Sequence, residues 1–296
     1  KYVHNYLVIL NSPQNMRNTM SNLDNNPLRQ YFRRPAVFLS LPTGGESYSS
    51  DVVEFPDNKE LPVYPMTAID EITTKTPDAL FNGSAMVEII KSCIPAIKDP
   101  WQLLSNDLDA VLVAVKAAGG QDSIDVETEC PKCKALGTYG IDLLSMLSSL
   151  KAGDYETPLQ ISDLSIKFSP LTYKEMNKAA LGQFDIQVKY KGLADIEDDE
   201  DRNTKTSTAL KEITVLTQNI LSKAIESITT PTSKVDETNY ILDFLMQCDG
   251  KTYEAIRDYN TKLKSDSTIK PLHIQCQECE HKFSQPFSLN ASDFFA

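Results

Sequence analysis

Apolar residues recur at helical spacing in several parts of the chain, and this pattern predicts most of its regular structure. Two helices are expected at 85–94 and 105–118, the first capped by Ser84 and the second ended by a Gly-Gly pair. The longest helix is expected at 207–228. Its predicted apolar stripe consists of Leu210, Ile213, Leu216, Ile220, Ala224 and Ile228. Two further helices are expected at 235–248, ended by Gly250, and at 252–263.

Strict alternation of apolar and polar residues marks other segments as strands. Residues 158–168 alternate at Leu159, Ile161, Leu164, Ile166 and Phe168, so a strand or a hairpin is expected there, and the apolar run at 36–41 is expected to form a strand. Thr172 followed by Glu175 has the spacing of a capping box, which predicts a helix over 170–181. Residues 142–150 are expected to form a short helix or an extended run.

These elements predict an α+β protein, mainly α, with an N-terminal extended arm and four regions. Residues 1–60 form the arm and a strand/turn region, and 61–122 a helical region. Residues 151–265 form an inserted strand and helical domain. The last three helices fit a small antiparallel bundle or, equally, a groove for a partner helix, because periodicity does not separate the two. The fourth region, 123–150 plus 266–296, is defined by its cysteines.

Two Cys-x-x-Cys pairs, each behind a strand-like run, indicate a split zinc ribbon. The pairs are Cys130 with Cys133 and Cys276 with Cys279. One such turn places two thiolates on one side of a metal, and a second turn completes the four tetrahedral ligands that zinc prefers. Because no coordination position stays open, the zinc is expected to be structural.

The spacing leaves other interpretations open. Residues 134–275 separate the pairs, far more than the loop of about 15–20 residues in an ordinary ribbon. Two disulfides, two redox pairs or an empty, degenerate ribbon are the alternatives, and His281 is a substitute ligand for one cysteine. The remaining cysteines, Cys93 and Cys248, fall on apolar helix stripes and are expected in cores.

Composition limits the classes of function. The 296 residues carry a formal net charge of −12, which argues against nucleic-acid binding because such surfaces need clustered Lys and Arg. An acidic run at 195–201 lacks the glycine and terminal glutamate of a calcium loop, so it is expected to be a solvated loop, with electrostatic docking as the alternative. No segment predicts a membrane span or a secretory signal. No catalytic motif is present, so no enzyme is expected.

Several stretches resemble the baseplate hub protein family of T-even-like contractile-tailed bacteriophages. They are Tyr31-Phe-Arg-Arg-Pro-Ala-Val-Phe-Leu-Ser-Leu-Pro-Thr-Gly-Gly45, Leu61-Pro-Val-Tyr-Pro-Met-Thr-Ala-Ile-Asp-Glu71, Thr76-Pro-Asp-Ala-Leu-Phe-Asn-Gly83 and the two cysteine pairs. The resemblance covers about residues 27–145 and, by motif, the last twenty residues, but it does not reach the insertion.

The resemblance implies a virion protein that helps to build the baseplate or hub of a contractile tail, after assembly in the host cytoplasm. Other baseplate or tail proteins are the expected partners, including hub and tape-measure proteins, with several copies per assembly. One alternative is a tail assembly chaperone that is absent from the mature virion. A zinc-ribbon protein that binds nucleic acid is the other.

Overall fold

The computed structural model describes residues 26–75, 79, 81–192, 198–267 and 269–287. It divides the chain into two units, residues 1–34 and 35–296. In the first unit, a short 3-10 helix, η1 (Pro27–Tyr31), begins at Asn26, whose side chain accepts a hydrogen bond from the Leu28 amide. The predicted N-terminal arm lies almost entirely outside the described residues.

The second unit contains two hydrophobic cores, and the first is formed mainly by residues 37–150. Strands β1 (Val37–Leu39) and β2 (Leu61–Val63) pair antiparallel. The other elements are α3 (Ala68–Thr74), α5 (Ser84–Cys93), η2 (Pro100–Gln102), α6 (Ser105–Ala118) and α7 (Leu143–Ser149). The bounds of helices α5 and α6 are therefore confirmed within a residue, but Ser84 is the first residue of α5 and not its cap, because Gly83 stands at the cap position. Cys93 is fully buried here, as expected.

Helix α6 is buried on nearly all sides, and a buried carboxylate ties the neighbouring turn to it. Asp107 accepts hydrogen bonds from the Thr43 amide at 3.0 Å, the Thr43 hydroxyl at 2.6 Å and the Tyr48 hydroxyl at 2.7 Å. Burial raises the pKa of Asp107, and these three donors oppose that shift. The hydrogen bonds make it possible to bury a carboxyl group in an otherwise apolar core.

The second core packs helices against a four-stranded antiparallel sheet with the order β5-β6-β7-β8. Its strands are β5 (Leu159–Ile161), β6 (Leu164–Phe168), β7 (Ile225–Thr229) and β8 (Lys234–Val235). Its helices are α9 (Asp199–Lys223), α10 (Thr238–Gln247) and α11 (Gly250–Ser267). The prediction of a helical bundle is therefore only partly right, because buried strand residues such as Ile166 and Phe168 also form this core.

Two helix boundaries and the burial of one cysteine in this region differ from the predictions. Helix α9 ends at Lys223, and Ile228 belongs to β7, because this β-branched segment pairs with β6. Gly250 begins α11 rather than ending α10, since the Asp249 side chain accepts hydrogen bonds from the Lys251 and Thr252 amides. Cys248 is only half buried, so it is not a core residue.

Helix α8 (Tyr173–Lys189) begins with the predicted capping box and runs two turns further than expected. The acidic run is the largest correction: residues 199–201 form the first turn of α9, and Asp198 caps it. Acidic side chains are favourable there because the amino end of a helix carries partial positive charge. Residues 195–197 lie outside the described part of the chain.

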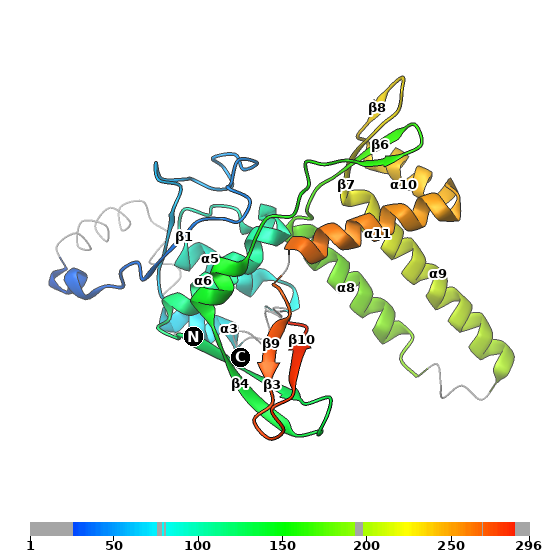
Figure 1. The fold of residues 1–296 in the computed structure, drawn as a ribbon. Coiled ribbons are helices and arrows are strands. Elements are labelled where there is room, and N and C mark those ends of the chain that lie inside the picture. The colour runs from blue at the N-terminus through cyan, green and yellow to red at the C-terminus, as the bar shows by residue number, and fades with distance from the viewer. Residues whose placement is uncertain (1–25, 76–78, 80, 193–197, 268, 288–296) are drawn as a thin grey trace, which may run out of the picture. The chain divides into compact units, whose positions relative to one another are not determined.

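The two cysteine hairpins form separate two-stranded sheets. In the first, β3 (Ser123–Glu129) pairs with β4 (Leu136–Asp142); in the second, β9 (Leu272–Gln275) pairs with β10 (Lys282–Gln285). Figure 1 shows the red second hairpin beside the green first one. Ile124, Ile141 and Phe287 pack against the first core, so both hairpins are attached to it.

Candidate metal centre

The two Cys-x-x-Cys turns have the same backbone geometry. The Cys130 amide donates to the Ala135 carbonyl at 2.9 Å, and the Cys276 amide donates to the His281 carbonyl at 2.9 Å. The residue after each second cysteine is a non-glycine in the left-handed region, Lys134 with φ 62° and Glu280 with φ 55°. Because this conformation is uncommon for such residues, its occurrence at both positions indicates that each turn is built to hold its cysteines in one arrangement.

The four sulfur atoms meet in a single cluster. Cys130 Sγ lies 3.7 Å from Cys279 Sγ, and Cys133 Sγ lies 3.6 Å from Cys276 Sγ. All four sulfurs are within 4.8 Å of one another. Two sulfurs bound tetrahedrally to one zinc ion are about 3.8 Å apart when each bond is about 2.3 Å. The cluster therefore has the dimensions of a tetrathiolate metal site, whereas a disulfide needs a separation of about 2.05 Å.

Backbone amides stabilise the thiolate form at the first cysteine of each pair. The Cys279 amide, with a contribution from that of Glu278, lowers the pKa of Cys276 to about 6. Burial raises the pKa of Cys130, but the Cys133 and Lys132 amides and the neighbouring sulfurs outweigh burial and lower it. A lowered thiol pKa favours metal binding, because the thiolate is the ligand.

The second cysteine of the first pair behaves in the opposite way. The Ala135 amide favours the Cys133 thiolate, but the nearby sulfurs and burial raise the pKa of Cys133 to about 12. Four thiolates this close repel one another, and a cation between them removes that repulsion. The donor set, four cysteine sulfurs without an open position, suits a structural metal ion such as zinc.

Contacts outside the cluster also join the hairpins, and sequence reasoning missed them. The Thr128 hydroxyl lies 3.0 Å from the side-chain carbonyl oxygen of Gln285. The Tyr139 hydroxyl approaches Cys276 and the Gln277 amide, and burial followed by the charge of Cys276 raises its pKa. Gly137 leaves room for that ring, because a Cβ there would come within 2.7 Å of the Tyr139 hydroxyl. The sequence Gly137-Thr-Tyr139 in a strand was the available signal.

His281, the alternative ligand, contributes its backbone rather than its ring to this arrangement. Its ring stacks on Phe283, with centroids 6.4 Å apart. The metal-ligand cluster found in the described residues consists of the four cysteines. The identity of the metal and the assignment of these residues as its ligands remain predictions.

Comparison with known proteins places this arrangement in a family. The model of the T4 bacteriophage base plate protein family matches residues 52–296, which include both hairpins and the insertion that the sequence resemblance did not reach. The chain belongs to the T4 bacteriophage base plate protein family. Membership of this structural family implies a place in the phage tail, contacts with other tail proteins and a non-enzymatic role.

No curated protein and no solved structure matches this baseplate protein. In the part of the chain that the structure describes, none of the helices is long and apolar enough to cross a membrane.

Proposed function

We propose that this baseplate protein is a hub component of a contractile tail and that one structural zinc ion holds its split ribbon together. The meeting of four sulfurs from hairpins far apart in the chain supports the zinc most directly, since Cys133 and Cys276 are 143 residues apart. Family membership supports the location in the virion tail. Its partners are other tail proteins, including hub and tape-measure proteins, and it acts in several copies.

The zinc acts by stabilising the fold. Each hairpin contains only two strands, and an isolated two-stranded hairpin is marginal in water. Metal binding that requires the folded state adds its binding free energy to folding. The staple supports the proposal that 123–150 plus 266–296 form one module and that 151–265 is an insertion which leaves and returns to it. The split between regions 1–60 and 61–122 stays a prediction from the sequence pattern.

Substitution of the cluster tests the zinc. Cys130→Ser and Cys276→Ser are expected to lose zinc and to lower the melting temperature together, because each leaves three thiolates for the metal. Cys248→Ser is the matched control: that half-buried cysteine lies outside the cluster, so zinc content should stay at one ion per chain. The measurements are elemental analysis and melting with and without a strong chelator. Unchanged melting in chelator contradicts the proposal.

An inventory of purified virions tests the hub assignment. Quantitative mass spectrometry should find the chain in a fixed ratio to known tail proteins, and cross-linking should place it next to the central hub. Its absence from mature virions would favour an assembly chaperone. Binding to DNA that falls steeply with salt would favour a nucleic-acid binder, which the net charge of −12 argues against.

A further inference from the structure

The hairpin of helices α8 and α9 is largely uncovered by the rest of the chain. Only Tyr173, the first residue of α8, is buried in that 17-residue helix. In the 25 residues of α9, only Ala209, Leu221 and Ser222 are buried. Helices of this size normally gain their stability by burying an apolar face against other elements.

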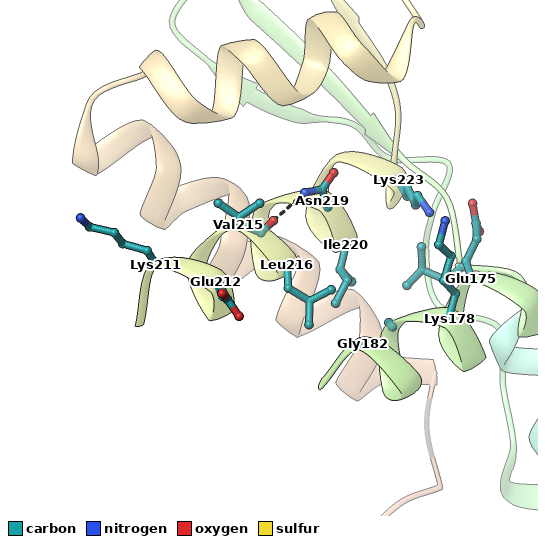
Figure 2. A pocket seen from close by; sticks show the side chains of 12 residues that line it. Glu175, Lys178, Gly182, Lys211, Glu212, Val215, Leu216, Asn219, Ile220 and Lys223 are labelled. Atoms are coloured by element: carbon teal, nitrogen blue, oxygen red, sulfur yellow. Dashed lines mark hydrogen bonds between the residues drawn. The ribbon is translucent and has the colours of Figure 1, made fainter. Parts of the chain in front are cut away.

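An apolar groove of about 580 Å³ runs along the seam between these helices (Figure 2). Gly182 lets the two helices approach closely, because a Cβ there would come within 3.3 Å of Leu216. Val215, Leu216 and Ile220 of α9 and Ala179 of α8 supply apolar lining. Such a groove has the shape and chemistry that accept one face of a further helix.

The charges along the groove select the chemistry of an occupant. Lys178, Lys211 and Lys223 line it, and none of them forms an ion pair with another described residue. The two acidic lining residues are already engaged: Glu175 in the capping box and Glu212 with Lys189 and Tyr190. Figure 2 shows Lys178 and Lys223 at one end and Lys211 at the other. With three lysines against two glutamates, one of which is paired with Lys189, the lining carries a net positive charge in a chain whose net charge is −12.

We propose that this groove binds an acidic amphipathic helix of another tail protein, with its apolar face on the seam and its carboxylates beside the three lysines. The proposal names the partner chemistry for the assembly role above and rests on that role. A second copy that used the same groove would bring these lysines toward each other, and like charges across an interface are unfavourable.

A designed helix of about 20 residues, similar in length to α8 at about 26 Å, is the probe. It carries leucines on one face and glutamates on both flanks; its control has lysine in place of every glutamate. Fluorescence anisotropy with the zinc-loaded full chain should show binding of the acidic helix, weakening as salt is raised, and about tenfold weaker binding of the basic one.

Three variants localise the binding. Leu216→Asp should abolish it, whereas Leu210→Asp, on the same helix but outside the groove, should not. Because Leu216→Asp can also disturb folding, the double variant Lys178→Glu with Lys223→Glu is the second test. Lys178 is exposed, Lys223 is half-buried, and neither forms an ion pair with another described residue, so the fold should stay intact. Reversal of their charges should exchange the preference so that the basic helix binds better. Lys174→Glu, on α8 but outside the lining, is its matched control.

The results distinguish this proposal from the zinc proposal. Absent binding, equal binding of both probes, or an effect of Leu210→Asp as large as that of Leu216→Asp overturns the groove while zinc content stays normal. A concentration-dependent dimer that Leu216→Asp abolishes and the acidic helix does not displace overturns it in favour of a second copy. Conversely, if a strong chelator leaves the melting temperature unchanged while the acidic helix still binds, the zinc staple alone is overturned.

Discussion

Helices α6 and α9 show that the same kind of apolar pattern can lead to very different burial. Ten of the 14 residues of α6 are buried, but only three of the 25 residues of α9 are. Helix α6 is enclosed because β1, β2, α5, α7 and α8 all pack on it. Helix α9 contacts mainly α8 and α10. Periodicity therefore identifies an apolar face, but it does not show whether the same chain covers that face.

Shortening one isoleucine in the first core, which encloses α6, and one on α9 tests this difference and should give the largest effect. Ile90 of α5 is fully buried in the first core, whereas Ile213 of α9 is 47% exposed. Ile90→Ala should lower the free energy of unfolding by about 2–5 kcal/mol, because it removes buried methyl groups and leaves a cavity. Ile213→Ala should change it by less than about 0.5 kcal/mol. Urea unfolding followed by circular dichroism measures both, and similar losses would contradict the comparison.

Removal of the buried carboxylate of α6 should have the next largest effect. Asp107→Ala leaves the Thr43 amide and hydroxyl and the Tyr48 hydroxyl without their acceptor, so a loss of about 3 kcal/mol is expected. The thermal midpoint and amide exchange at residues 41–48 measure this loss. Asp57→Ala, in an exposed turn, is the control and should leave both unchanged. If Asp107→Ala changes neither the thermal midpoint nor the amide exchange, the turn does not depend on this residue.

The smallest effect is expected at Asp109, on the edge of α6, and it depends on pH. Asp109 lines a cavity of about 170 Å³ with Tyr155 and Lys264, and burial raises its pKa to about 6. The folded state therefore holds this proton more tightly than the unfolded state, so stability falls as pH rises from about 4 to about 6.

Asp109→Asn removes the buried charge and should stabilise the protein at pH 8 by at most about 3 kcal/mol, since one pKa unit corresponds to about 1.4 kcal/mol. The gain should disappear below about pH 3, where the carboxyl group of Asp109 is neutral in both the folded and the unfolded state. Glu88→Gln, on the exposed face of α5, is the control and should show no such pH dependence. A constant difference between Asp109→Asn and the unsubstituted protein at both pH values would exclude this explanation.

The sequence correctly predicted those helix ends that depend on residues close together in the chain. The capping box of Thr172 and Glu175 correctly marks the start of α8. Thr67 and Asp70 form a second capping box at α3, although the Asp70 side chain also accepts from Ser92, 22 residues away. Long-range pairing determined the elements that were missed. Residues Ile225–Thr229 continue the apolar stripe of a helix, yet they pair with β6 as a strand because that places Ile225 and Ile228 in the second core.

The sequence alone was enough to predict two equivalent metal-binding turns, because a Cys-x-x-Cys turn depends on only a few consecutive residues. The helical periods likewise determined which faces are apolar. Only the tertiary structure decided that the four sulfurs meet across an insertion of more than a hundred residues, and that the seam of α8 and α9 stays open. Both depend on contacts between distant segments, and no local pattern specifies which segments come together.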